Sequence, residues 1–380
     1  MFDIVSPDAI REGRATDAYF RRTREALEGA GKNPHIVAEV TADQFPDGDF
    51  EVFAGVKDAA HLLDGRDVTV HALPEGTLFD GGPVMRMEGD YLAFAELETS
   101  LLGFLSPASG HATAAREVAT AAGEKPAISF GARHVHPSTA AALERAALVG
   151  GMDGISHVAA GEILGREPSG TMPHALIICF GRGNQEQAWQ AFDEHVDPEV
   201  PRVALVDTYS DEKDEAVRAA ETIDSLESVR LDTTGSRRGD FRHIIREVRW
   251  ELDANGFDDV GVFVSGGLTA QRVRDLHDVA DGFGVGSYIS NADPVDFALD
   301  IVEVDGEPAA KRGKLSGTKQ VYRTPDGDHV VALADRPGPT DGEPLLKPVI
   351  EDGELVADFD LDAAVDRCAA DAKTVGFGAE

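Results

Sequence analysis

The sequence predicts an α/β fold built on a parallel β-sheet, either open or closed into a barrel. From about Ala127 onward, short β-branched runs alternate with amphipathic helical segments, which is the pattern of βα units. Each run ends in polar, glycine-rich sequence, as in barrels whose chemistry sits at the carboxyl ends of the strands. The 380 residues exceed one average domain, so we expect at least one further domain.

The elements follow in order along the chain. Before Ala127, a helix is expected over Thr16–Leu27, a strand over Val68–Leu73 and an apolar-periodic helix over Tyr91–Leu105. The predicted strands of the parallel sheet are AISFGARH, RVALVDT, SVRLDT, VGVFVSGG and DGFGVGSYI. The helices expected between them include TAAALERAALVGG, DEKDEAVRAAETI, FRHIIREVRWELDANG and TAQRVRDLHDVA. After Asp300 this alternation stops: a basic segment, KRGKLSGTKQVYR, precedes an acidic end that contains Pro and Gly.

The composition is strongly acidic. Asp and Glu number 69 against 35 Lys and Arg, a net charge of −34, and only nine of the bases are Lys. Because the acids are spread along the chain, the balance is typical of a protein adapted to concentrated salt, and it argues against nucleic acid or an anionic membrane as partner. The alternative is an acidic protein without that adaptation.

Targeting signals and cysteine sites are not expected. Only Cys179 and Cys368 are present, which excludes a disulfide framework and a zinc site made of cysteines. The first residues, MFDIVSPDAIREG, have no basic start and no apolar stretch, and no apolar run approaches the ~18 residues of a membrane-spanning helix. We therefore expect a cytoplasmic protein.

Salt adaptation makes a testable prediction. With 34 net negative charges, the fold should lose stability as salt falls to about 0.1 M, where the Debye length of about 10 Å leaves the repulsion weakly screened. Thermal unfolding across a potassium chloride series measures this. A midpoint that stays flat or falls as salt is added would contradict the adaptation.

Two aspartates are candidate metal ligands. Asp207 in LVDTYSD and Asp232 in RLDTTG each end a hydrophobic run, so they are expected at neighbouring strand ends. Mg²⁺ bound to a pyrophosphate uses such an arrangement of a few carboxylates, waters and substrate oxygens. The alternative is that both residues cap the helices that follow.

Glycine-rich turns are candidate phosphate sites. Ser265, Gly266 and Gly267 follow one predicted strand, and Gly286 and Ser287 follow the next. Successive glycines let backbone N–H groups approach an anion, and many barrels bind phosphate after their last two strands. Tight strand–helix turns are the alternative explanation.

Cationic and aromatic candidates complete the set. In GTMPH, Thr171 is expected to cap a helix and His174 to lie in its first turn, either as an anion-binding group or as a purely structural residue. Arg133 and His134, in FGARHVHP, could bind a carboxylate or phosphate, or pair with one of the many acids. Tyr19 is either a stacking platform or a core residue.

Together these segments resemble the nicotinate phosphoribosyltransferase family, especially its archaeal type, over roughly residues 10 to 325. The resemblance rests on motifs in family order, of which GTMPHALI and the series VRLD, VSGG and GVGSYI are the most specific. It implies an irregular (β/α) barrel with an N-terminal α/β-sandwich domain, the type II phosphoribosyltransferase fold, in a homodimer or larger homo-oligomer. The implied domains are 1–108 joined by 301–325, a barrel over 109–300, and an acidic extension over 326–380.

The resemblance also implies an activity and roles. The substrates would be nicotinate, phosphoribosyl pyrophosphate and ATP as co-substrate, with Mg²⁺ on Asp207 and Asp232, in NAD biosynthesis. His174 would be a phosphohistidine, and Tyr19 would stack on nicotinate. Thr171 and Arg230 would contact nicotinate, and Arg133 would bind its carboxylate or a substrate phosphate. The 5′-phosphate would be held by Gly266, Gly267, Gly286 and Ser287.

Two departures and three alternatives accompany this interpretation. His134 replaces the second arginine of the family's FG-x-RR motif, which makes its anion-binding role pH-dependent. Some archaeal relatives have a cysteine zinc knuckle at the C-terminus. This chain has only Cys368 there, so no zinc is expected. The alternatives are the decarboxylating quinolinate enzyme, a nicotinamide-specific enzyme and a non-catalytic phosphate-binding barrel. The quinolinate enzyme would need more cationic groups around a second carboxylate, and GTMPH is not its signature.

Overall fold

The computed structural model describes residues 2–42, 50–232, 239–325 and 327–378, and divides the chain into two compact units. The first consists of residues 1–113, 149–151 and 292–380, and the second of residues 114–148 and 152–291. Each unit has its own apolar core. Of the predicted motifs, residues 233–238 of VRLDTTGSRRGD lie outside the described part of the chain. In the described residues, no helix is long and apolar enough to cross a membrane.

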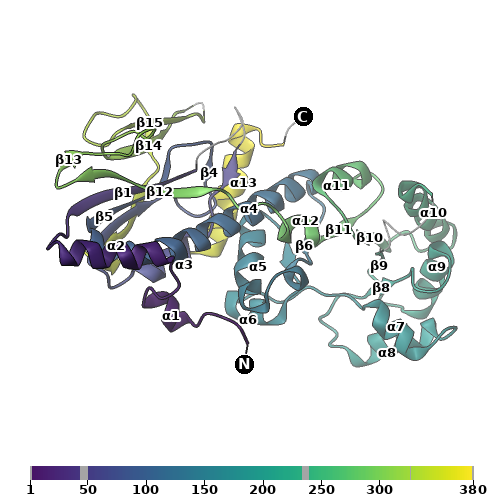
Figure 1. The fold of residues 1–380 in the computed structure, drawn as a ribbon. Coiled ribbons are helices and arrows are strands. Elements are labelled where there is room, and N and C mark those ends of the chain that lie inside the picture. The colour runs from purple at the N-terminus through teal and green to yellow at the C-terminus, as the bar shows by residue number, and fades with distance from the viewer. Residues whose placement is uncertain (1, 43–49, 233–238, 326, 379–380) are drawn as a thin grey trace. The chain divides into compact units, whose positions relative to one another are not determined.

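A seven-stranded sheet, antiparallel throughout, forms the first unit (Figure 1). Its order is β13-β12-β1-β5-β3-β17-β18. The strands are β1 (His35–Ala42), β3 (Val68–Ala72), β5 (Pro83–Asp90), β12 (Phe297–Val304), β13 (Glu307–Pro308), β17 (Lys347–Glu351) and β18 (Glu354–Leu355). β1 lies inside the sheet because its run HIVAEV is buried almost throughout, and it pairs with β5 on one side and β12 on the other. This sheet is separate from the parallel sheet that the sequence predicts.

Shorter elements complete the first unit. The helices are α1 (Pro7–Arg11), α2 (Ala18–Gly29), α3 (Val56–Leu63), α13 (Leu361–Val375) and the first part of α4 (Glu98–Ala122), with 3₁₀ turns η1 (Tyr91–Ala93) and η2 (Ala95–Leu97). Small sheets contain β2 (Glu51–Val52) with β4 (Leu78–Phe79), and β14 (Lys319–Arg323) with β15 (His329–Leu333) and β16 (Glu343–Pro344). Residues 327–378, expected in an acidic extension, contribute strands and α13 to this unit.

Six parallel strands form the sheet of the second unit, in the order β7-β6-β11-β10-β9-β8. They are β6 (Ala127–Ser129), β7 (Gly154–Ile155), β8 (Val203–Leu205), β9 (Ser228–Leu231), β10 (Gly261–Ser265) and β11 (Gly282–Val285). This is the cyclic strand order of a (β/α) barrel opened between β7 and β8. The predicted α/β fold with a parallel, barrel-like sheet is therefore confirmed at this level.

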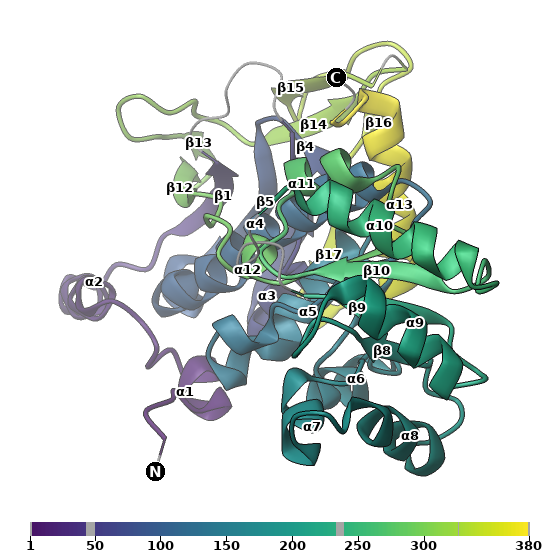
Figure 2. The same ribbon diagram turned by 90° about the vertical axis from the view of Figure 1, so that its right-hand side faces the viewer.

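Helices follow the strands and cover the sheet. They are α5 (Ala140–Val149), α6 (Val158–Leu164), α7 (His174–Phe180), α8 (Gln185–His195), α9 (Glu212–Thr222), α10 (Phe241–Ala254), α11 (Ala270–Leu276) and α12 (Ser287–Ser290), with 3₁₀ turns η3 (Ala132–His134) and η4 (Pro137–Thr139). α9 and α10 lie along β9 and β10 (Figure 2). α10 does so because Phe241, Ile245, Val248 and Leu252 recur at helical spacing and are buried.

Glu144 of α5 is a buried carboxyl group, which gives a prediction about pH. Burial raises the pKa of Glu144 to about 7, and the nearby polar groups of Ser129 and of the Ser156 backbone only partly oppose this. Since the folded pKa lies above the unfolded value, the cost of charging Glu144 grows from about pH 4.5 and is complete above pH 7. We expect Glu144→Gln to raise the midpoint of thermal unfolding at pH 8 and to leave it unchanged at pH 4. An equal effect at both pH values would contradict this.

Candidate active site

The carboxyl ends of β8 and β9 carry the two predicted aspartates. These strands are neighbours in the sheet, so Asp207 and Asp232 are brought together. The Oδ2 atom of Asp207 accepts a hydrogen bond from the backbone N–H of Asp232 at 2.7 Å, which joins the two strand ends. Asp232 in turn accepts a hydrogen bond at Oδ1 from the hydroxyl of Ser265, at the end of β10, at 2.6 Å. The N-caps of α9 and α10 are Asp211 and Asp240 instead.

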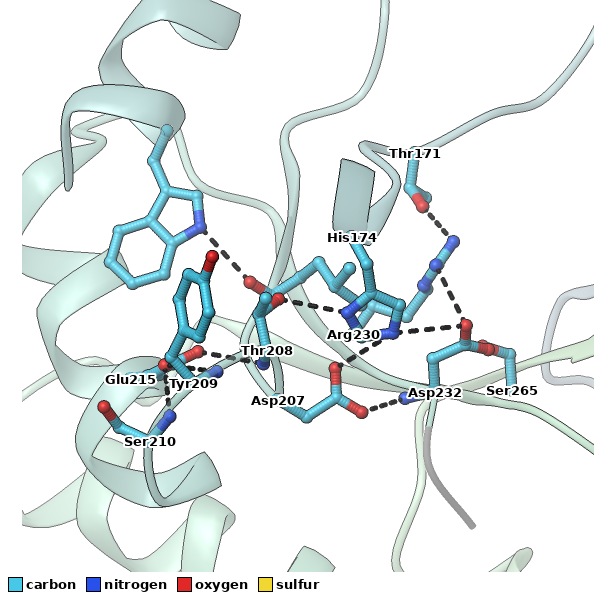
Figure 3. Close-up of polar contacts among 12 residues, drawn as sticks. Thr171, His174, Asp207, Thr208, Tyr209, Ser210, Glu215, Arg230, Asp232 and Ser265 are labelled. Atoms are coloured by element: carbon cyan, nitrogen blue, oxygen red, sulfur yellow. Dashed lines mark hydrogen bonds and ion pairs between the residues drawn. The ribbon is translucent and has the colours of Figure 1, made fainter. Parts of the chain in front are cut away.

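His174 lies opposite these two carboxylates (Figure 3). Its Nε2 atom is 3.8 Å from Oδ1 of Asp207 and 3.7 Å from Oδ2 of Asp232. Its Nδ1 atom is 3.1 Å from Oγ1 of Thr208, the residue after Asp207. The imidazole is thus oriented from one side by a hydroxyl and faces two acids on the other.

The helix that begins at His174 differs in one detail from the expectation. Thr171 was predicted to be its N-cap, but the cap position is occupied by Pro173, and no side chain caps the helix. The hydroxyl of Thr171 is instead an acceptor for Nη1 of Arg230. The prediction was wrong because the pattern Thr-x-Pro also fits an extended segment, in which the hydroxyl is free to meet a neighbouring strand.

Arg230, on β9, lies at the centre of the cationic groups. Its side chain is 11% exposed, its Nη2 atom is 3.5 Å from Oδ2 of Asp232, and its guanidinium lies 6.0 Å from the ring centre of Phe130. Burial lowers the pKa of the Arg230 guanidinium. The charges of Asp232 and Asp207 raise this pKa, and the charge of Arg133 lowers it further. Among the described residues, the buried Nε of Arg230 has no hydrogen-bond partner.

Arg133 and His134 follow β6 in η3. Nε of Arg133 is 3.4 Å from Nε2 of His134, and Nδ1 of His134 is 3.1 Å from the hydroxyl of Ser290. Since the charge of Arg133 acts on Arg230, these side chains and His174 form a group of four cationic or potentially cationic residues. The structure therefore places near one another the four groups that the sequence offered as anion-binding candidates.

The glycine-rich turns follow β10 and β11. Gly266 and Gly267 have φ values of +89° and +69°, and a Cβ atom at Gly266 would collide with the backbone oxygen of Asp232. A Cβ atom at Gly286 would lie 2.9 Å from the oxygen of Phe130. Glycine is therefore required at both turns for close backbone approach. Ser287 begins α12, and the hydroxyl of Ser265 is occupied by Asp232.

Two further observations concern Tyr19 and three residues that the sequence did not single out. Tyr19 belongs to the first unit, on α2, where its side chain is 55% exposed. Thr208, Phe130 and Glu215 were not singled out, although each contacts a candidate residue or its loop. Thr208 and Phe130 stand next to recognised motifs in the sequence, and that adjacency was the available signal.

A barrel-like parallel sheet whose strand ends carry acids, cations and glycine turns is typical of enzymes that act on small phosphorylated substrates. The chain belongs to the quinolinate phosphoribosyltransferase family. Its residues 17–109 match the model of the N-terminal domain of quinolinate phosphoribosyl transferase, and residues 111–300 match that of the C-terminal domain.

Solved structures and curated relatives are similar to the chain. A nicotinate-nucleotide pyrophosphorylase from Pyrococcus furiosus is 49% identical and covers 99% of both chains with a TM-score of 0.95. Human nicotinic acid phosphoribosyltransferase, at 21% identity and a TM-score of 0.75 over 94% of each chain, shares the fold. A nicotinate phosphoribosyltransferase of Mycobacterium tuberculosis is 32% identical over 311 residues, which are 76% of this chain and 68% of that protein.

These findings correct the interpretation drawn from the motifs. The prediction of the nicotinate phosphoribosyltransferase family is wrong, because the matching family models and the 49% identical structure indicate the quinolinate family. The predicted ATP co-substrate and the phosphohistidine at His174 are withdrawn with it. Loss of CO₂ can itself drive transfer to quinolinate, so no coupled hydrolysis is required. The motifs misled because the two families share a fold.

Proposed function

We propose that this chain is a quinolinate phosphoribosyltransferase, which forms nicotinate mononucleotide, pyrophosphate and CO₂ from quinolinate and phosphoribosyl pyrophosphate. The observation that carries the proposal is the 49% identity over 99% of both chains to a nicotinate-nucleotide pyrophosphorylase. The fold would be that of type II phosphoribosyltransferases, and the product would enter NAD biosynthesis. A homodimer, with Tyr19 stacking on the acceptor, belongs to the same proposal.

The acceptor's two carboxylates suit the cationic side of the site. Arg230 is buried, and its Nε has no partner among the described residues, so a substrate carboxylate would satisfy it. Arg133 and His134 supply further donors close by. A substrate with two adjacent carboxylates uses these groups more fully than one with a single carboxylate.

The reaction needs positioning and charge stabilisation rather than a protein nucleophile. The pyridine nitrogen attacks C1 of the ribose, and the C1–oxygen bond breaks with its electron pair passing to pyrophosphate. The C2–carboxylate bond then breaks, and the pair left on C2, stabilised by the adjacent ring cation, takes a proton from water. Arg230 and Arg133 would orient the acceptor, and the turns at Gly266 and Gly286 would hold the 5′-phosphate.

The carboxylates fit Mg²⁺ in part. Among the residues described, no three His, Cys, Asp or Glu side chains form a closed metal site. Two carboxylates with further oxygens from a pyrophosphate are nevertheless what Mg²⁺ uses. The side chain of Asp232 is 30% exposed, so Asp232 is the more accessible ligand. The side chain of Asp207 lies behind His174 and is only 1% exposed. Bound Mg²⁺ would neutralise charge on the departing pyrophosphate.

An acceptor panel tests the proposal. The protein is incubated in high salt with Mg²⁺, phosphoribosyl pyrophosphate and either quinolinate, nicotinate or nicotinamide, without ATP. We expect mononucleotide from quinolinate, with a kcat/KM at least tenfold above that for nicotinate, and no activity after chelation of Mg²⁺. Transfer to nicotinate alone would contradict the proposal.

A further inference from the structure

A buried carboxylate behind the site is not used by the reaction described above. Glu215 lies in the first turn of α9 and is completely buried. Its Oε1 accepts hydrogen bonds from the backbone N–H groups of Tyr209 at 3.2 Å and Ser210 at 2.7 Å, and from Nε2 of Gln185 at 3.0 Å. Its Oε2 accepts one from the N–H of Thr208 at 3.3 Å. Four donors thus converge on one carboxylate.

This arrangement fixes the loop that follows β8. Three consecutive backbone N–H groups, those of residues 208–210, point at the carboxylate of Glu215 (Figure 3). Gln185 of α8 holds the same carboxylate from the other element, so Glu215 and Gln185 together set the path of this loop. A fully buried carboxylate is costly unless donors compensate it, and four donors do so. Because three of these donors belong to the loop before α9, whose N-cap is Asp211, Glu215 holds the loop and does not cap the helix.

The loop leads directly to the reacting groups. The backbone N–H of Thr208 donates a hydrogen bond to Glu215, and the hydroxyl of Thr208 is 3.1 Å from Nδ1 of His174. The other nitrogen of His174 faces Asp207 and Asp232 at 3.8 and 3.7 Å. Through Thr208, Glu215 is therefore one residue away from both the imidazole of His174 and Asp207, and the imidazole in turn faces Asp232.

We propose that Glu215 is a positioning residue, which orients the imidazole of His174 against Asp207 and Asp232 by fixing the backbone of Thr208. Its effect on substrates rests on the function proposed above, whereas its effect on the imidazole does not. Glu215→Gln keeps the size of the side chain but places an amide NH₂ among donors, so at least one of the four hydrogen bonds is lost. Thr208 should shift, and the hydrogen bond to His174 should weaken.

A matched control lies at the opposite end of the same strand. Asp193 of α8 accepts hydrogen bonds from Nε of Arg202 at 2.9 Å and from the hydroxyl of Ser225 at 3.2 Å, beside the start of β8. Asp193→Asn removes a carboxylate from a comparable network that has no connection to His174. Both variants should lower the midpoint of thermal unfolding, so stability alone does not distinguish them.

The experiment observes the imidazole directly. Full-length protein labelled with ¹⁵N-histidine is compared as wild type, Glu215→Gln and Asp193→Asn, with the His174 signals assigned by His174→Asn. We expect the ring ¹⁵N shifts of His174 to change in Glu215→Gln and to stay unchanged in Asp193→Asn. Unchanged shifts in Glu215→Gln, or equal changes in both variants, would overturn the proposal.

A second measurement separates this proposal from the proposed function. The affinity for phosphoribosyl pyrophosphate with Mg²⁺ is measured by calorimetry without any acceptor. We expect it to fall about tenfold in Glu215→Gln, equivalent to about 1.4 kcal/mol, and by less than twofold in Asp193→Asn. If wild type binds but does not use quinolinate, the acceptor assignment fails and the role of Glu215 stands. If the shifts move but the affinity is equal in all three proteins, Glu215 orients the imidazole and its expected effect on phosphoribosyl pyrophosphate binding is refuted.

Discussion

Asp232→Asn is expected to lower kcat for phosphoribosyl transfer by about a thousandfold, because several kcal/mol of charge stabilisation are lost and each 1.4 kcal/mol is tenfold in rate. The amide oxygen can still accept the hydrogen bond from Ser265, so the turn after β10 should persist. What disappears is the negative charge opposite His174 and Arg230, at 3.7 and 3.5 Å. Initial rates at saturating substrates measure the effect.

The control for Asp232 is Asp259→Asn, an exposed aspartate just before β10. It changes the net charge by the same amount on the same strand–helix unit, and should leave kcat unchanged. If Asp232→Asn retains more than a tenth of wild-type activity while folding normally, the carboxylate is not a ligand for the pyrophosphate-bound ion.

Arg230→Lys should lower kcat/KM for the acceptor by about ten- to a hundredfold, the equivalent of one charge-assisted hydrogen bond of about 1.5–3 kcal/mol. The guanidinium meets Thr171, Asp232 and the face of Phe130 at the same time. A lysine ammonium is a point charge and cannot reproduce this planar arrangement, so the conservative change should not preserve recognition. Kinetics with varied acceptor at saturating phosphoribosyl pyrophosphate measure the loss.

Two variants make the Arg230 result specific. Arg218→Lys, in a half-exposed ion pair with Glu186 on α8, should have no kinetic effect, because the pair lies at the surface and ion pairs there contribute little. Thr171→Val removes only the acceptor of Nη1 and should show a smaller loss than Arg230→Lys. A loss confined to KM for phosphoribosyl pyrophosphate would place Arg230 on the phosphates instead of the acceptor.

Much of the barrel was predictable because its strands occur in the sequence as short runs rich in β-branched residues, each followed by polar residues. All five predicted strands of the parallel sheet contain an observed strand, from β6 to β11, and VTVHAL contains β3. β7 was missed because it has only two residues, Gly154 and Ile155, and so no hydrophobic run. The antiparallel sheet could not be assembled from sequence, since its neighbours β1 and β12 are more than 250 residues apart.

The site was predictable by residue type but not by its connections. Asp207 and Asp232 were found because carboxylates at the ends of adjacent parallel strands must meet. The contacts of Thr208 and Glu215 were not predicted. They depend on which backbone N–H groups a buried carboxylate reaches, and no sequence periodicity indicates this. The choice of acceptor also failed from sequence motifs, since the decisive difference is one carboxylate on the substrate.

The most direct test of the central claim is the stoichiometry of decarboxylation. Quinolinate labelled with ¹⁴C in its 2-carboxylate is incubated with phosphoribosyl pyrophosphate, Mg²⁺ and the protein in high salt, without ATP, and released CO₂, pyrophosphate and nicotinate mononucleotide are measured together. The proposed function predicts equal amounts of the three products, and none with Asp232→Asn. Absence of labelled CO₂, while nicotinate under the same conditions yields mononucleotide, would contradict it.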